Sequence, residues 1–183
     1  RTDLNNLQTQ LQARPWVARA AVRRQWPGIL RVSLQEHIAV ARWNDNALLT
    51  SQGQVFKPQT LPVLEGVPSL GGVDSSSIEV LKQYVRLQDE LAELNMQVVL
   101  MQKSERGAWK LQLMAVEVPE DGATEQKVLI EVALGKQGFD ARLARFKNLY
   151  SSVLKARFNE IERVDLRYTN GVAVQWKTRR VTR

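Results

Sequence analysis

The sequence predicts an α+β protein in which antiparallel sheet is covered by helices on one side. Apolar residues recur every three to four positions over 3–13, 75–95 and 139–158, which is the spacing of amphipathic helices. Several shorter segments alternate apolar with polar residues and end at turn residues, which is the pattern of half-buried strands. With 183 residues, the chain is long enough for two small domains.

The first part of the chain predicts a short helix followed by strands. Asp3 is placed to cap a helix that Pro15 ends. Residues 20–26 and 29–37 alternate on either side of Pro-Gly, so we expect a hairpin. A further pair of short strands is expected over 39–45 and 48–56, with a turn at Gly53.

The next segment, 57–72, reads KPQTLPVLEGVPSLGG and breaks any regular pattern with its prolines and glycines. We interpret it as the junction between two modules. The module before it is so small that we expect it to lean on a neighbour or to lack an N-terminal element.

The second module begins with the longest predicted helix, 75–95. Ser76 and Glu79 have capping-box spacing, and one face is expected to carry Ile78, Leu81, Val85 and Leu91. Strands are expected over 96–102, 108–118 and 127–135. A second helix is expected over 139–158, with an apolar side made of Leu143, Phe146, Tyr150, Val153 and Leu154.

The chain then reads DLRYTNGVAVQW, where Asn-Gly between alternating residues signals a hairpin. A loop of Thr169, Asn170 and Gly171 would place all its apolar side chains on one face. The expected pairs are then Tyr168 with Val172, Leu166 with Val174, and Val164 with Trp176. If the last strand ends the sheet, its outer edge either accepts a strand from a partner or is protected by the basic tail.

Composition excludes several chemistries. The chain has no cysteine and one histidine, His37, which we expect to be an ordinary surface or edge residue. No apolar run is long enough to cross a bilayer. The acidic cluster of Glu117, Glu120, Asp121 and Glu125 lacks the spacing of a metal loop and is interpreted as a solvated turn.

The formal net charge of +7 suggests a second interpretation, a nucleic-acid-binding module. The excess lies at the two ends, with a balance of +5 over residues 1–60, −2 over 61–160 and +4 over 161–183. Arginines next to Trp26 and Trp176 could hold phosphates while the rings stack on bases. A third hypothesis, an enzyme that cleaves cell-wall glycan, lacks an identifiable pair of carboxylates.

Several segments together resemble one family in order along nearly the whole chain. They are PWVARAAVRRQWPGILRVSLQEHIAVARWND, QGQVF, LPVLEG, GFDARLARFKNLY and VDLRYTNGVAVQW. The chain is similar to the periplasmic part of the FtsQ family of bacterial cell-division proteins. The resemblance implies a POTRA domain over 1–57 that lacks its first strand and helix, an FtsQ-type β domain over 58–177, and a basic C-terminal tail over 178–183.

The resemblance also implies the function. Family members have no known catalytic activity, cofactor or metal, and act as scaffolds of the divisome that help to control septal peptidoglycan synthesis. They bind FtsB and FtsL, with an FtsB segment added as a strand to the last β-strand, and contact other division proteins through the POTRA domain. An N-terminal helix anchors them in the inner membrane, so this region would lie in the periplasm at the division septum.

By position, the resemblance assigns the FtsB contact to a small set of residues: Arg106, Arg167, Tyr168, Asn170, Ala173 and Trp176. The pair Thr169-Asn170 departs from relatives that have Asp-Ser there, so an amide replaces a small hydroxyl in that turn.

Overall fold

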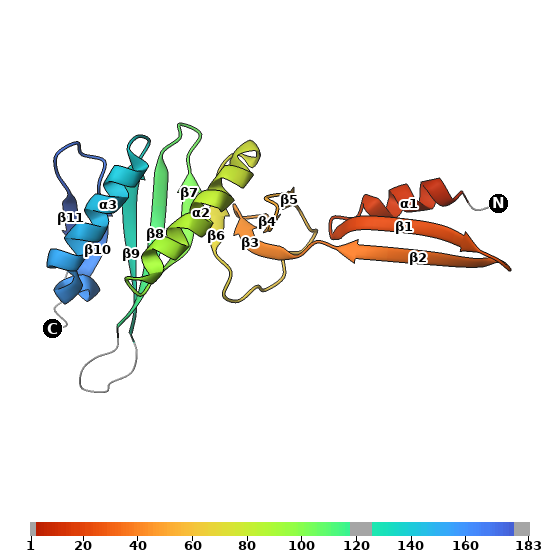
Figure 1. Cartoon of the computed structure of the whole chain (residues 1–183), viewed down its shortest axis with the longest axis horizontal. Helices are drawn as coiled ribbons and strands as arrows, with labels where there is room; N and C mark the ends of the chain where they lie inside the picture. Colours follow the sequence, from red (N-terminus) through yellow and green to blue (C-terminus); the bar gives the residue numbers. More distant parts are fainter. Residues whose placement is uncertain (1–2, 118–125, 178–183) are drawn as a thin grey trace, which may run out of the picture. The chain divides into compact units, whose positions relative to one another are not determined.

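The computed structural model describes residues 3–117 and 126–177. The chain forms two compact units, Arg1–Val67 and Pro68–Arg183, here called unit 1 and unit 2 (Figure 1). The predicted α+β class is confirmed, because both units combine helix with sheet. Two features expected from the sequence lie outside the described residues. They are the side chains of the acidic cluster at 117–125 and the basic tail at 178–183.

The described residues of unit 1 form one helix and five strands. These are α1 (Leu4–Gln12), β1 (Val17–Gln25), β2 (Ile29–Glu36), β3 (Ala39–Trp43), β4 (Ala47–Thr50) and β5 (Val55–Phe56). The predicted cap is confirmed, because the Asp3 carboxylate accepts hydrogen bonds from the backbone N–H groups of Asn5 (3.0 Å) and Asn6 (3.3 Å). The predicted hairpins are confirmed too: β1 pairs antiparallel with β2, and β3 with β4.

Helix α1 covers one half of one face of the β1–β2 hairpin. Ala20 of β1 is only 1% exposed on that face, whereas its cross-strand partner Leu34 is 53% exposed. Leu30 and Val32 of β2, on the same face, are also exposed, at 41% and 43%. Further along unit 1, the Phe56 ring packs against Trp16 and His37, with centroids 5.1 and 4.9 Å away.

Unit 2 is one sheet with two long helices on the same face (Figure 1). Its helices and strands are β6 (Ser69–Gly71), α2 (Ser77–Ala92), β7 (Met96–Lys103), β8 (Trp109–Glu117), β9 (Gln126–Gly135), α3 (Phe139–Leu149), β10 (Ile161–Asp165) and β11 (Ala173–Trp176). A short 3-10 turn, η1 (Asp74–Ser76), precedes α2. A π-helical turn, η2 (Tyr150–Leu154), and a 3-10 turn, η3 (Lys155–Glu160), continue α3.

The strand order in unit 2 is β11-β10-β9-β8-β7-β6. The sheet is mixed rather than wholly antiparallel, because β6 pairs parallel with β7 and β9 pairs parallel with β10. Each parallel pair is joined through a helix, α2 or α3. A helical crossover returns the chain to the same end of the sheet, whereas a tight turn reverses it.

The buried face of α2 differs from the predicted one. Val80, Leu87 and Leu91 are fully buried, whereas Ile78 and Val85 are 53% and 51% exposed. The apolar residues of α2 occupy a wide arc around the helix. The sheet covers the part of this arc that contains Val80, Leu87 and Leu91, and leaves Ile78 and Val85 exposed. Only Leu91 and the half-buried Leu81 keep their predicted role.

The predicted capping box of α2 is wrong. The Ser76 hydroxyl donates to the Val73 carbonyl oxygen (2.8 Å) and makes no capping bond to the helix. Glu79 instead forms an ion pair with Lys103 of β7, with 2.5 Å between Nζ and Oε2. The η1 turn before α2 supplies the helix entry in place of the side-chain cap.

Candidate functional site

Strand β11 ends the sheet of unit 2, and β10 is its one neighbour within the described residues (Figure 1). The Lys177 N–H donates to the Glu160 carbonyl oxygen (2.7 Å), on the β10 side. Because backbone amides alternate along a strand, the N–H groups of Val174 and Trp176 point to the outer edge. That edge therefore presents hydrogen-bonding groups of the kind a further strand can pair with.

The hairpin before this edge is confirmed, but its predicted register is wrong. The structure pairs Val164 with Val174 and Ile161 with Trp176, so the connection runs over 166–172 instead of Thr169-Asn170-Gly171. The Leu166 N–H donates to the Ala133 carbonyl of β9 (2.9 Å), and its side chain is fully buried. The chain therefore follows β9 for longer than a tight turn allows.

Two arginines of α3 hold the 166–172 connection. Arg145 donates from Nη1 to the carbonyl oxygens of Tyr168 (3.0 Å) and Gly171 (3.3 Å), and from Nη2 to that of Thr169 (2.9 Å). One guanidinium thus satisfies three backbone carbonyls of the 166–172 connection at once.

Arg142, one turn earlier on α3, joins β9 to the same connection. Its Nη1 donates to the Leu134 carbonyl (2.5 Å) and its Nη2 to the Arg167 carbonyl (2.9 Å). Sequence reasoning missed both α3 arginines. Their three-residue spacing on a helix that precedes the hairpin was the available signal, but that spacing alone does not reveal what the side chains reach.

Arg167 is fixed by an ion pair with Asp165. Its Nη2 lies 2.6 Å from Oδ2, its Nε donates to both carboxylate oxygens, and its backbone N–H donates to Oδ1 (3.0 Å). These hydrogen bonds lower the pKa of the Asp165 carboxyl, against the opposing effect of its burial. The same contact raises the pKa of the Arg167 guanidinium, which stays 58% exposed beside the edge.

Five of the six residues assigned by resemblance lie in the hairpin. Arg167, Tyr168 and Asn170 are in the connection, and Ala173 and Trp176 are in β11. The predicted pairing of Tyr168 with Val172 on an apolar face is wrong. The Tyr168 side chain is 58% exposed. The side chains of the connection are thus exposed from Arg167 onward to Gly171, whereas Leu166 is buried.

Trp176 lies at the opposite end of β11 from this connection. The Arg157 guanidinium carbon lies 4.5 Å from the centre of its ring, a cation–π distance. The side chain remains 40% exposed. The ring is thus held in place by η3 and still offers apolar surface at the edge.

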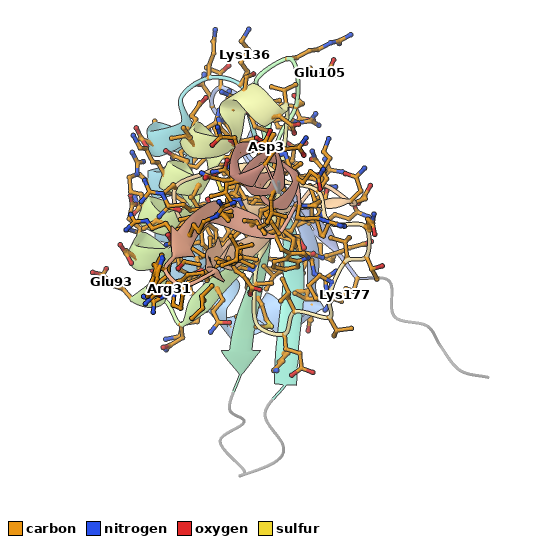
Figure 2. The ribbon with its side chains drawn as sticks, turned by 90° about the vertical axis from the view of Figure 1, so that its right-hand side faces the viewer. Asp3, Arg31, Glu93, Glu105, Lys136 and Lys177 are labelled. Carbon is orange, nitrogen blue, oxygen red and sulfur yellow. The ribbon has the colours of Figure 1, made fainter. Side chains whose placement is uncertain are left out.

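Arg106 lies apart from the other five residues. It is exposed in the turn that joins β7 to β8, closed by a hydrogen bond from the Gly107 N–H to the Ser104 carbonyl (2.8 Å). Its neighbour Glu105 and Lys136 project at one end of unit 2 (Figure 2). Strands β8, β9 and β10 separate β7 from β11, which is about 19 Å at ordinary strand spacing.

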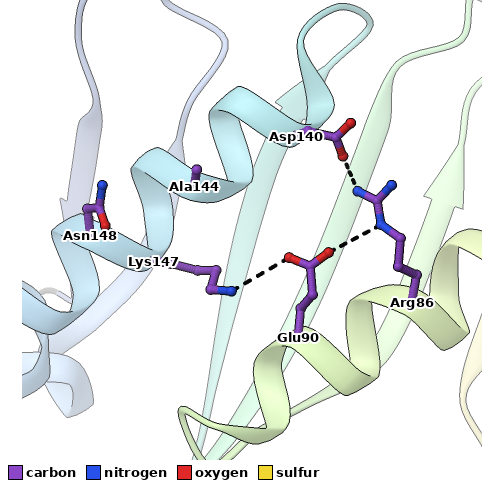
Figure 3. Close-up of a pocket in the computed structure, with 6 residues that line it drawn as sticks. All are labelled: Arg86, Glu90, Asp140, Ala144, Lys147 and Asn148. Atoms are coloured by element: carbon purple, nitrogen blue, oxygen red, sulfur yellow. Dashed lines mark hydrogen bonds and ion pairs between the residues drawn. The ribbon is translucent and has the colours of Figure 1, made fainter.

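A second candidate is the hollow between α2 and α3, with a volume of about 320 Å³ (Figure 3). Its charges satisfy one another: Arg86 pairs with Asp140 and with Glu90 (3.2 Å), and Lys147 pairs with Glu90 (3.6 Å). Asp140 raises the pKa of Arg86. This arrangement joins the two helices and leaves no free charged group aimed into the hollow.

Neither a metal-binding cluster nor a membrane-spanning helix is present among the described residues. The described residues contain no group of three or more His, Asp or Glu side chains that could hold a metal ion. None of the helices over 3–117 and 126–177 combines the length and the apolar character needed to cross a membrane.

The fold defines the class of protein: a small helix-and-hairpin unit followed by a β domain in which β11 is the edge strand among the described residues. The model of the FtsQ-type POTRA domain matches residues 1–37. The model of the C-terminal region of the cell division proteins FtsQ and DivIB matches residues 41–167. The chain therefore belongs to the FtsQ/DivIB family of cell-division proteins.

Individual relatives agree with this assignment. The chain is 36% identical to cell division protein FtsQ of Coxiella burnetii over 93% of its own length and 65% of the relative's. It is 37% identical to the Shewanella oneidensis protein over 95% and 61%, and 34% identical to the Thioalkalivibrio protein over 96% and 68%. The chain thus spans about three fifths to two thirds of these relatives' lengths.

Proposed function

We propose that this chain is a non-enzymatic scaffold of the division machinery that binds FtsB and FtsL through strand addition at β11. The outer edge of β11, which pairs with no strand among the described residues and lies next to a connection held by side chains of α3, is the observation that supports this proposal most strongly. A strand of FtsB would pair with the outward N–H groups of Val174 and Trp176.

Side chains around the edge would give the pairing its specificity. Tyr168 and Trp176 are exposed aromatic residues at the two ends of the hairpin, and such residues commonly dominate binding energies. Asp165 already holds the Arg167 guanidinium in place. Arg167 would therefore interact with an acidic residue of the partner without reorienting. Asn170 and Ala173 are exposed between them.

Arg106 would serve a second, more distant contact. Because it lies at the β7–β8 turn, a single added strand at β11 does not reach it. A helix of the partner that leads into the added strand and crosses this end of unit 2 would pass near it. Lys136, at the same end, is a further cation for such a helix (Figure 2).

The whole protein would act at the inner membrane. An upstream helix would anchor it in the inner membrane, which places both units in the periplasm at the septum. There, the complex with FtsB and FtsL would help to regulate septal peptidoglycan synthesis, while unit 1 would contact other division proteins.

We also propose that residues 1–57 form a POTRA domain without its first strand and helix, and that residues 58–177 form the β domain. The exposed Leu30, Val32 and Leu34 side chains support it, since they offer an apolar surface beside α1 that an upstream helix would cover. Protection of β2 amides from exchange in a longer chain, relative to this one, is the expected result.

Titration calorimetry with a complex of the periplasmic FtsB and FtsL segments tests the proposed site. Tyr168→Ala and Trp176→Ala are each expected to weaken binding by about 2 kcal/mol. Ile78→Ala, which removes an equally exposed apolar side chain from α2, is the matched control and should bind normally. Equal affinities for all variants would contradict the site.

Val174→Pro tests the strand pairing itself. Proline removes the outward N–H of Val174 and keeps the pairing of Gln175 with β10, so the fold should persist while strand addition fails. Unchanged affinity in a folded Val174→Pro protein would exclude pairing at this edge.

A further inference from the structure

The β1–β2 hairpin of unit 1 has a second face that α1 does not cover. Strand alternation and register place Arg19, Arg23 and Arg31 on this face, opposite to the face that contains buried Ala20. All three arginines are exposed, and the register positions between them carry no Asp or Glu. We call these three residues the arginine face.

The positive charge of the arginine face is not compensated within the fold. Arg23 and Arg31 are direct cross-strand partners, and like charges in that position destabilise a sheet. No ion pair among the described residues involves any of the three arginines. Residues 1–37 contain six arginines and only two acidic residues, Asp3 and Glu36.

The tip of the same hairpin carries a large exposed aromatic residue. Trp26 is 89% exposed, in the turn between β1 and β2, and Ile29 beside it is 55% exposed. Arg24 precedes this turn. Tryptophan prefers the boundary between water and an apolar phase, because its ring is apolar and its indole N–H is polar.

We propose that the arginine face and Trp26 dock on the surface of an anionic phospholipid bilayer. Guanidinium groups bind phosphate through paired hydrogen bonds, and a phosphate layer would remove the repulsion between Arg23 and Arg31. Arginines beside an exposed tryptophan form the combination that holds interfacial segments on membranes. Because FtsQ proteins are division-associated membrane proteins, a bilayer is within reach of unit 1.

The geometry favours a flat surface over a polymer. The arginine face is one side of a two-stranded ribbon, with Trp26 beyond its end rather than between the arginines. Stacking on nucleic-acid bases requires aromatic rings interleaved with the cations. A bilayer has a layer of phosphate headgroups above an apolar interior. The phosphates would bind the arginine face, and Trp26 would lie at the boundary with the apolar interior.

Vesicle co-sedimentation tests the proposal on the full chain. Vesicles of equal parts phosphatidylglycerol and phosphatidylcholine are compared with pure phosphatidylcholine at physiological ionic strength. Each arginine near an anionic surface contributes about fivefold in binding, so Arg23→Gln with Arg31→Gln should reduce binding about 25-fold. Trp26→Ala should reduce it further at constant charge.

A charge-matched control separates the arginine face from overall charge. Lys82→Gln with Lys155→Gln removes the same charge from exposed sites in unit 2 and should leave vesicle binding unchanged. The melting temperature of the arginine double variant should not fall, since the substitution relieves a like-charge contact. A lowered melting temperature would show that the arginines stabilise the hairpin, and would overturn the proposal.

The remaining outcomes are decisive in either direction. Binding to the phosphatidylglycerol vesicles that only the hairpin substitutions weaken supports the proposal. Equal loss in the lysine control, equal binding to pure phosphatidylcholine, or no binding overturns it. Retardation of a single-stranded oligonucleotide without vesicle binding overturns it in favour of a nucleic-acid site.

Discussion

Replacing Arg145 tests whether side chains of α3 hold the β10–β11 connection. Arg145→Ala leaves three carbonyl oxygens, those of Tyr168, Thr169 and Gly171, without their present donor. A hydrogen bond from a charged donor contributes about 1.5–3 kcal/mol when it is shielded from water. Because this connection is exposed, water replaces much of each bond, and we expect a total loss of about 1–2 kcal/mol.

Thermal unfolding followed by circular dichroism measures this loss, with an expected decrease in the melting temperature of about 2–8 °C. Amide exchange should also speed up over 166–172 and remain unchanged in α2. Arg145→Lys keeps the charge but lacks the planar fork, so it should recover less than half of the loss. Full recovery by lysine would show that charge, rather than the three-carbonyl geometry, is the cause.

Other substitutions around the same hairpin have distinct expected outcomes. The hydrogen bonds from Arg167 lower the pKa of Asp165 in the folded state. The ionised Asp165 carboxylate therefore stabilises the fold above the ordinary carboxyl range, and this stabilisation is lost as the pH falls below about 4. In urea unfolding, Asp165→Asn should remove this pH dependence of the free energy of unfolding. Gly135→Ala should destabilise by about 1–3 kcal/mol in the same assay, since Gly135 has φ +72° and a Cβ there would lie 2.8 Å from Arg142 Nη1. Leu166→Ala should cost about 2–5 kcal/mol because the side chain is fully buried, and a loss below about 1 kcal/mol would contradict the packing described here.

Periodicity predicted the elements of this fold well. The α1 cap at Asp3, the hairpins of unit 1 and the helices of unit 2 all follow from local residue patterns. These features depend on neighbours within a few positions along the chain, and the sequence displays such neighbours directly.

Long-range contacts explain what periodicity missed. The hairpin register depends on the hydrogen bond between Leu166 and Ala133 and on the reach of Arg145 from α3. The exposed Ile78 and Val85 show that an apolar stripe on α2 does not specify which side the sheet will cover. In each case the deciding partner lies on a different element.

The candidate site divides in the same way. The position of the edge strand at the chain end was predictable, and the resemblance supplied residues that the structure places along it. The ion pair of Arg167 with Asp165 and the packing of Arg157 on Trp176 were not predictable, since both need the folded hairpin and η3 in place.

Amide hydrogen exchange of β11, resolved by residue in the presence of the periplasmic FtsB segment, tests the central claim most directly. Strand addition predicts that the outward N–H groups of Val174 and Trp176 become protected on binding. The inward N–H groups of Gln175 and Lys177 should change less, because β10 already pairs with that side of β11. Tight binding with no new protection at Val174 and Trp176 would contradict a partner strand at this edge.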